Sequence, residues 1–190
     1  PISGFGALAR KFIDADKRVQ LQKSLIRSHA AGSGEIVEVE VIRAMMAVRL
    51  ATMCRGLSGV QLQTAETYAA MLNANITPVV REFGSLGCSG DLAPLSACAL
   101  AAMGEGEVIF KGQIIKTEVA FQTAGINPVE LSSKEGLALI NGTDGMLGQL
   151  VLAIFDITNL LKTLDITTSL SVEALLGTDR RSEEHTSELQ

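Results

Sequence analysis

Apolar residues recur at helical spacing over most of the chain, and this pattern predicts a predominantly helical fold. The clearest case lies between residues 36 and 53. There Val37, Val41, Met45 and Val48 share one helical face, and Glu and Arg residues occupy the other. We therefore expect an all-α fold class. The predicted helices span residues 19–29, 36–53, 60–74, 91–103, 146–164 and 167–176, with one more beginning near 132 and interrupted at 141–145.

Two segments depart from the helical pattern. Residues 107–116 contain two β-prone runs on either side of Lys111-Gly112, which predicts a small β-hairpin. Residues 84–90 are rich in glycine and lead into Asp91, a residue type that caps helix N-termini. No repeat or linker interrupts the pattern, so we expect one domain with a glycine-rich loop near its middle.

The composition predicts a packed aliphatic core. Hydrophobic residues make up 47% of the chain, whereas aromatic residues make up 4% and Trp is absent. Met45, Met46, Met71 and Met103 are expected to fill this core. The net charge of −5 gives no electrostatic reason for a nucleic acid or an anionic membrane as partner. We find no signal peptide and no apolar run of spanning length, and we expect no membrane partner.

The reactive residue types are few. Three cysteines, Cys54, Cys88 and Cys98, are an odd number without paired spacing, which indicates reduced thiols and a cytoplasmic protein. With only His29 and His185 in the chain, we expect neither a metal site nor a Ser-His-Asp triad. Tyr68 lies in a helical run and is expected to pack in the core rather than act as a base.

The two ends of the sequence differ from the rest of the chain. Residues 181–190 match the translation of a widely used sequencing adapter, so we expect an artefact tail after the native region at 1–180, the alternative being a genuine polar tail. Pro1 is not an initiator Met, so we expect the chain to begin within a longer protein or to be processed.

The string Gly84-Ser-Leu-Gly-Cys-Ser-Gly-Asp-Leu-Ala-Pro-Leu95 carries the candidate chemistry. Its parts are typical of a turn with a helix cap, and the lysine of a phosphate-binding loop is absent. The whole string resembles the signature of the aromatic amino acid lyase family, in which an internal tripeptide cyclises to methylidene-imidazolone. The family tripeptide is usually Ala-Ser-Gly, and here it is Cys88-Ser89-Gly90.

The cyclisation explains which positions can vary. The amide nitrogen of Gly90 attacks the carbonyl carbon of residue 88, and two waters are lost, one of them from the Ser89 side chain. Gly90 lacks a Cβ, which lets its nitrogen approach. Cys88 contributes only backbone atoms, so cysteine is compatible there. Asp91 is expected to cap the following helix and to assist the cyclisation. The resemblance implies no external cofactor.

Further segments carry the same resemblance. Residues 2–9 are similar to a family segment that follows a catalytic tyrosine, which places that tyrosine upstream of Pro1. Residues 27–32 match the helix that selects the substrate, where Ser28-His29 is typical of members acting on histidine. Residues 135–143 match the stretch whose asparagine, here Asn141, assists the cofactor. The chain thus resembles the N-terminal, cofactor-forming region of the ammonia-lyase fold.

The resemblance implies a histidine-catabolic enzyme that eliminates ammonia from L-histidine without oxidation and releases trans-urocanate. It also implies a homotetramer in which several subunits build each active site. Because the C-terminal helical region is missing, the fragment by itself is expected to be inactive. Two alternatives remain open: the same chemistry on phenylalanine or tyrosine, including aminomutation, and a non-catalytic helical assembly module.

Overall fold

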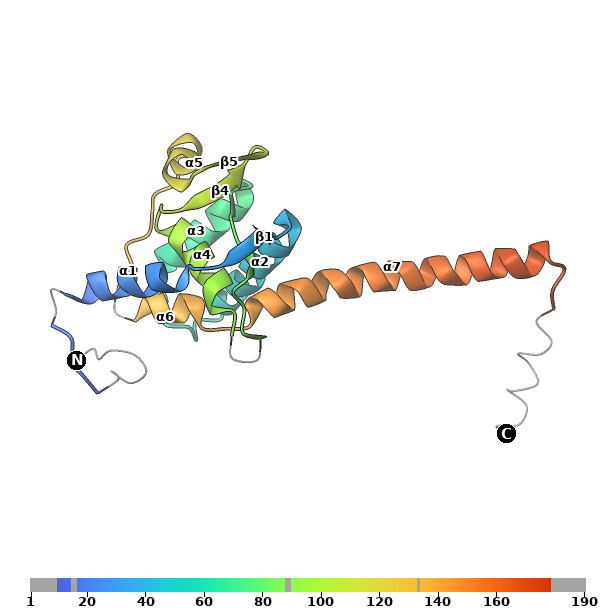
Figure 1. The fold of residues 1–190 in the computed structure, drawn as a ribbon, viewed down its shortest axis with the longest axis horizontal. Helices are drawn as coiled ribbons and strands as arrows, with labels where there is room; N and C mark the ends of the chain where they lie inside the picture. Colours follow the sequence, from blue (N-terminus) through green and yellow to red (C-terminus); the bar gives the residue numbers. More distant parts are fainter. Residues whose placement is uncertain (1–9, 15–16, 88–89, 133, 179–190) are drawn as a thin grey trace. The chain divides into compact units, whose positions relative to one another are not determined.

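The structure is a computed structural model that describes residues 10–14, 17–87, 90–132 and 134–178. The chain divides into two units, Pro1–Val151 and Leu152–Gln190, which are described separately. Helices dominate both units, as the apolar spacing predicts (Figure 1). The helices are α1 (Arg18–His29), α2 (Val39–Cys54), α3 (Leu62–Asn73), α4 (Leu92–Ala102), α5 (Thr117–Ala124), α6 (Glu135–Ile140) and α7 (Asp144–Ala174).

Two small antiparallel sheets accompany the helices. The hairpin expected at 107–116 is present as β4 (Glu107–Phe110) and β5 (Gln113–Lys116), with Glu107 opposite Lys116. Strand β2 (Thr77–Pro78) extends this sheet on the other side of β4. Strands β1 (Ser33–Ile36) and β3 (Arg81–Phe83) form the second sheet. These additional pairings were not predicted, because they join segments that are far apart in the sequence.

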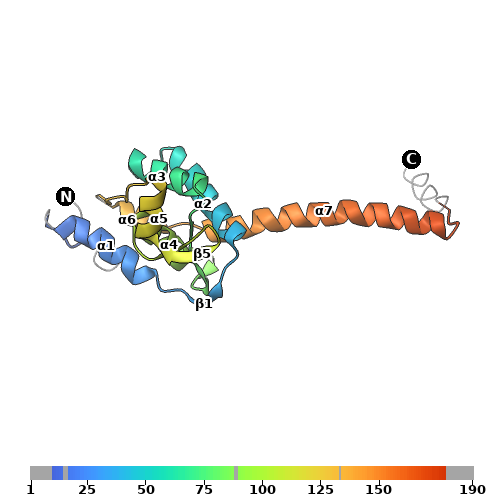
Figure 2. The ribbon, with the colours of Figure 1, turned by 90° about the horizontal axis from the view of Figure 1, so that it is seen from above.

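The core of the first unit lies among α1, α2, α3, α4 and α6 (Figure 2). Helix α4 contacts both α1 and α6, and α2 contacts α3. The buried side chains are mainly aliphatic, and the four methionines expected in the core are all buried. Tyr68 is fully buried on α3, in agreement with the packing role expected for it.

Helix α2 buries a different face from the one predicted. Its buried residues include Ile42, Met45, Met46 and Met53, whereas Val37, Val41 and Val48 are only partly covered. Arg49, assigned by the pattern to the polar face, lies on the buried side and is 3% exposed. The physical reason is a buried carboxylate partner that the periodicity of one segment cannot show.

Helix α7 corrects two sequence-based expectations. It is one helix from Asp144 to Ala174, not two, because neither Gly nor Pro interrupts it between Gln149 and Ala174. The segment Glu135–Ala174 is also long and apolar enough to cross a membrane by length and composition, with a mean hydropathy of 1.4 over an 18-residue window, contrary to the expectation from the sequence. Core helices of globular proteins meet the same criterion, so this property assigns no membrane role.

Candidate functional site

The loop between β3 and α4 carries the family-like tripeptide. Cys88 and Ser89 lie outside the described residues, and Gly90 is described and buried. The Gly90 amide donates a hydrogen bond to the Gly87 carbonyl at 2.8 Å. Gly90 adopts a φ of 113°, and a Cβ there would lie 3.1 Å from the Gly142 carbonyl oxygen. Both the backbone conformation and the close approach therefore favour glycine at position 90.

Asp91 connects this loop to a distant part of the chain. Its backbone amide donates to the Gly142 carbonyl at 2.7 Å, and its side chain is buried, with the residue 1% exposed. One carboxylate oxygen accepts from the Met146 amide at 3.0 Å, and the other accepts from the Ser85 hydroxyl at 2.5 Å. Asp91 occupies the N-cap position of α4, as predicted, but the expected side-chain capping bond is not formed. The Asp91 carboxylate instead accepts from an amide in the first turn of α7.

Asn141 ends α6 on the other side of this junction. Its side-chain oxygen lies 3.8 Å from the point that a Cβ on Gly90 would occupy. Asn141 also lines a cavity of about 390 Å³ together with Arg49, Lys134 and Leu137. The structure thus brings Gly90, Asp91 and Asn141 together, although about fifty residues separate the loop from Asn141 in the sequence.

A buried ion pair supports the turn after Asn141. The Arg49 guanidinium lies 2.5 Å from the Asp144 carboxylate and donates to the Ala138 carbonyl at 3.3 Å. Burial raises the pKa of Asp144, and the nearby Arg49 charge opposes that rise. A side chain at Gly142 would collide with both partners of the pair. The ion pair and Gly142 therefore fix the backbone that receives the Asp91 amide.

Ser28 and His29 lie at the C-terminal end of α1. The His29 Nδ1 atom lies 2.9 Å from the Leu25 carbonyl and 3.0 Å from the Ser28 hydroxyl oxygen. Because a carbonyl only accepts, Nδ1 carries the proton in the neutral ring, and Nε2 is then an acceptor. Among the described residues, no hydrogen bond joins Ser28 or His29 to Gly90, Asp91 or Asn141.

A salt bridge holds the same end of α1. Arg27 donates two hydrogen bonds of 2.8 Å to the Glu105 carboxylate, which lies after α4. The hydrogen bond from Arg27 is the main cause that lowers the pKa of Glu105. The pair therefore ties the Ser28-His29 turn to the far end of the helix that begins at Asp91.

The sequence profile of the family described as "Aromatic amino acid lyase" matches residues 3–190. The chain belongs to the aromatic amino acid lyase family. It is 58% identical over 179 residues to a histidine ammonia-lyase of Streptomyces avermitilis, covering 94% of this chain and 35% of that protein. It is 43% identical over 178 residues to a probable histidine ammonia-lyase of Thermoplasma acidophilum, covering 94% of this chain and 36% of that protein.

Solved structures of lyases and aminomutases share the fold. Histidine ammonia-lyase from Trypanosoma cruzi aligns with a TM-score of 0.84 at 35% identity, covering 88% of this chain and 33% of that chain. Phenylalanine aminomutase from Pantoea agglomerans aligns with a TM-score of 0.89 at 32% identity, covering 99% of this chain and 36% of that chain. The chain spans about a third of the length of the relatives that it matches.

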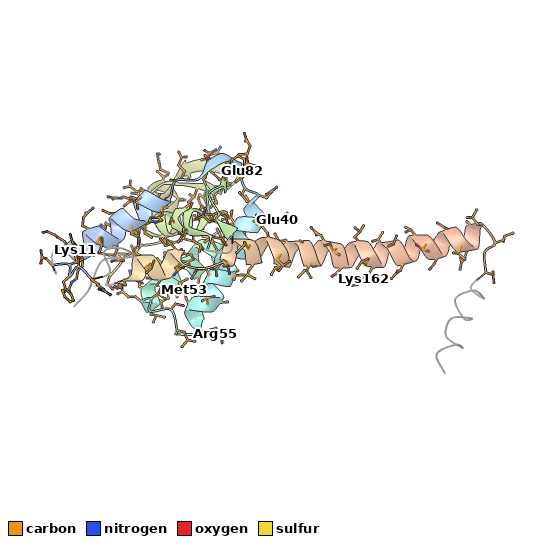
Figure 3. All side chains as sticks on the ribbon, turned by 60° about the horizontal axis from the view of Figure 1, so that its bottom comes forward. Lys11, Glu40, Met53, Arg55, Glu82 and Lys162 are labelled. Atoms are coloured by element: carbon orange, nitrogen blue, oxygen red, sulfur yellow. The ribbon has the colours of Figure 1, made fainter. Side chains whose placement is uncertain are left out.

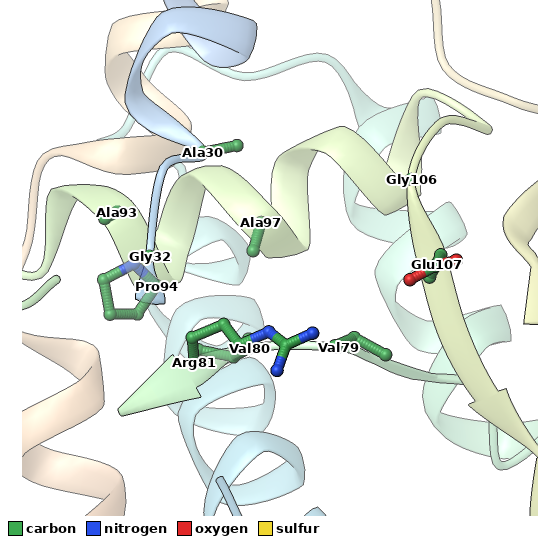
Figure 4. A pocket seen from close by; sticks show the side chains of 10 residues that line it. All are labelled: Ala30, Gly32, Val79, Val80, Arg81, Ala93, Pro94, Ala97, Gly106 and Glu107. Atoms are coloured by element: carbon green, nitrogen blue, oxygen red, sulfur yellow. The ribbon is translucent and has the colours of Figure 1, made fainter. Parts of the chain in front are cut away.

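A second cavity and Tyr68 are further features of this segment. A cavity of about 210 Å³ lies between α4, the chain leaving α1 and the strands, and Ala30, Arg81, Pro94 and Glu107 are among its lining residues (Figure 4). None of Gly90, Asp91 or Asn141 lines it. Burial raises the pKa of Tyr68 well above its ordinary value, which makes Tyr68 unsuited to act as a base.

Three residues that build the junction were not predicted from the sequence. Ser85 lay in the glycine-rich loop, Arg49 on the predicted polar face and Gly142 in the predicted helix interruption. The one available signal was the position of Arg49, four residues from both Met45 and Met53 and therefore on their side of the helix. Ser85 and Gly142 lie outside helices, so no periodic pattern indicates their partners. Ser85 bonds to Gly87 and Asp91 within its own loop, and Gly142 accepts from the distant Asp91 amide.

Proposed function

We propose that the full-length protein carrying this segment is a histidine ammonia-lyase whose electrophile forms from Cys88, Ser89 and Gly90. The observation that carries the proposal is the junction where Gly90, Asp91 and Asn141 meet, in a chain of this family. Gly90 has the positive φ and the close carbonyl neighbour that leave no room for a side chain. These residues fit a cyclised backbone, so no external cofactor is needed.

The methylidene-imidazolone would supply an electron sink that makes the substrate's amino group a competent leaving group. The roles of the surrounding residues follow from their contacts. Asp91 would hold the loop through its amide and carboxylate, and Asn141 would direct its amide group toward the ring formed at Gly90. The N-terminal ends of α4 and α7 both lie at Asp91 and would stabilise negative charge that develops there.

L-histidine is the proposed substrate, and trans-urocanate and ammonia are the proposed products. Ser28-His29 supports this choice, because His29 presents Nε2 as an acceptor that an imidazole N–H can donate to. The relatives from Streptomyces avermitilis and Thermoplasma acidophilum are named as histidine ammonia-lyases or probable ones. The high structural similarity to a phenylalanine aminomutase keeps that chemistry as the second candidate.

The proposed assembly is a homotetramer in the cytoplasm. Support comes from α7, where Ile154, Ile157, Leu161 and Leu164 follow one another at spacings of three and four residues and are each more than half exposed. Such a stripe is typical of helices that pack against other helices. The free thiols of Cys54 and Cys98 agree with a reducing compartment.

The test uses a full-length lyase, made by placing this segment in the matching region of the Streptomyces avermitilis relative. Cyclisation removes two waters, so the intact mass falls by about 36 Da. Ser89→Ala should keep the uncyclised mass and lose activity, whereas Ser24→Ala, on α1, should behave as wild type. Turnover of L-histidine far above that of L-phenylalanine and L-tyrosine is expected. An unchanged mass in folded wild-type protein would refute the cofactor, and preferred turnover of phenylalanine would refute the substrate.

A further inference from the structure

Ser85 contacts both sides of the Cys88-Ser89-Gly90 tripeptide. Its hydroxyl oxygen accepts a hydrogen bond from the Gly87 amide at 3.1 Å. The same hydroxyl donates to the Asp91 carboxylate at 2.5 Å. Gly87 comes directly before the tripeptide and Asp91 directly after it. One exposed serine therefore connects the two flanks of the segment that cyclises.

The other ends of this connection are fixed in the core. Asp91 is 1% exposed and is held by the Met146 amide and the Gly142 carbonyl. The Gly90 amide donates to the Gly87 carbonyl at 2.8 Å, so the position of Gly87 constrains the position of the Gly90 nitrogen. Through Ser85, that constraint extends to the buried Asp91.

We propose that Ser85 is a positioning residue for the cyclisation, an inference that rests on the proposed function above. In the reaction a bond forms between the Gly90 nitrogen and the carbonyl carbon of Cys88. The oxygen of that carbonyl leaves as water with the amide protons of Gly90 and Ser89. The second water takes the Ser89 hydroxyl and the proton on its Cα. No oxidant or reductant is needed. We expect the rate to depend on how well the loop holds the Gly90 nitrogen near the carbonyl carbon.

The size of the effect follows from how a constrained loop reacts. A nucleophile held near its target reacts much faster than one that must first find it. A hydrogen bond to a carboxylate is stronger than one between neutral groups. Without the Ser85 hydroxyl, the Gly87 side of the loop loses its link to Asp91 and gains conformational freedom. In this role Ser85 acts on the reaction through Gly87 and Asp91.

The experiment follows the mass of the full-length lyase during refolding from denaturant. The Ser85→Ala variant should lose 36 Da roughly ten-fold or more slowly than wild type. The Ser85→Thr variant retains a hydroxyl and should cyclise within about three-fold of the wild-type rate. The Ser85→Cys variant has a weaker donor and should fall between the two. Ser24→Ala removes an exposed serine hydroxyl on α1 and should leave the rate unchanged.

The possible outcomes separate the role of Ser85 from the proposed function as a whole. Cyclisation of Ser85→Ala at the wild-type rate would overturn the role of Ser85. A second result would also overturn it: Ser85→Ala cyclises slowly, its thermal midpoint falls in parallel, and Ser85→Thr does not restore the cyclisation rate. That result would indicate a general loss of stability. If wild type itself never loses 36 Da, the proposed function fails first. If Ser85→Ala does not fold, the ordering of Ser85→Thr and Ser85→Cys decides.

Discussion

The compact unit that ends at Val151 and the part of α7 that follows it differ in the kind of side chain that they bury or expose. In the compact unit, polar side chains are buried: Arg49, Asp91 and Glu135 are 3%, 1% and 1% exposed, and each has hydrogen-bond partners. In α7 beyond residue 152, large apolar side chains are exposed, with Phe155 at 64% and Leu160 at 66%. Figure 3 shows side chains projecting from α7 on either side of Lys162.

This difference separates the interactions that the segment completes internally from those that we propose other helices or chains provide. Burial of a polar group without a partner is costly, so paired buried polar groups mark a place where geometry is specified. A long exposed apolar stripe is unfavourable in water and is typical of a surface that another helix or chain covers. The compact unit therefore fixes the positions of Gly90, Asp91 and Asn141 in the proposed site, and we propose that α7 joins this segment to the rest of the assembly.

The largest expected effect comes from charging the α7 stripe. The double variant Ile157→Asp/Leu161→Asp puts two carboxylates where we propose that helices pack. Each apolar side chain contributes about 1.5–3 kcal/mol when buried, so association should weaken more than about a hundred-fold. Sedimentation of the full-length lyase should show the loss of the tetramer, and histidine turnover should fall with it.

The matched control for the stripe is Asn159→Asp, which adds charge to the same helix away from the stripe. It should leave both the sedimentation coefficient and the turnover near wild type. A tetramer that survives the double substitution would show that this stripe is covered in some other way, and the contrast between the two regions would lose its functional meaning.

The next largest effect concerns the buried ion pair. Arg49→Met leaves the Asp144 carboxylate buried without its partner, and removal of one member of such a pair costs about 3–5 kcal/mol. Urea denaturation of the full-length lyase should show this loss. The double variant Arg49→Met/Asp144→Leu removes both charges and should recover most of it. If the double variant is as unstable as the single one, the pair is not what holds the Asn141–Asp144 turn.

These cases show where sequence reasoning succeeds. Most predicted helices agree with the structure within about three residues, because an apolar period and its end signals are local properties. The hairpin at 107–116 is local in the same sense. Gly90, Asp91 and Asn141 were selected through resemblance to a family, and the structure places them together.

Three of the errors share one physical cause. The Asp91 carboxylate could not be assigned to the first turn of α7 from sequence, because its partner, the Met146 amide, lies 55 residues away. Arg49 was predicted to lie at the surface, because the residue that neutralises it, Asp144, lies 95 residues later in the sequence. The strand pairing of β2 with β4 is likewise long-range. Contacts of this kind depend on how elements pack, which no single periodic segment encodes.

A smaller effect is expected at Glu135, which joins the starts of α3 and α6. Its carboxylate accepts hydrogen bonds from the Gln61 amide and side chain, the Thr64 hydroxyl and the Ser132 amide. Burial by itself would raise the pKa of Glu135, but these hydrogen bonds outweigh it and lower the pKa below 4.5. In Glu135→Gln, the side-chain NH2 group faces these hydrogen-bond donors and cannot accept from them. The free energy of unfolding should therefore fall by about 2 kcal/mol at pH 7.

The pH dependence of this effect has a definite sign. Because the folded pKa of Glu135 lies below the unfolded value, its stabilisation is present above about pH 4.5 and is lost as the pH falls through the folded pKa. The stability difference between wild type and Glu135→Gln should therefore shrink below about pH 4.5. Glu118→Gln, on exposed α5 surface, serves as the control. A difference that stays constant from pH 7 to pH 3 would contradict the role assigned to the carboxylate.

The smallest effect belongs to the Arg27–Glu105 pair, which holds the Ser28-His29 end of α1 at the surface. Exposed ion pairs contribute little to stability and are screened by salt. Arg27→Lys keeps the charge but loses the two-pronged contact, so the thermal midpoint should change little. The KM for L-histidine should nevertheless rise by about two- to five-fold, because a loosened helix end orients His29 less well. Lys116→Ala, which breaks the exposed Lys116–Glu107 pair, should leave KM unchanged, and an equal rise there would remove the special role of Arg27.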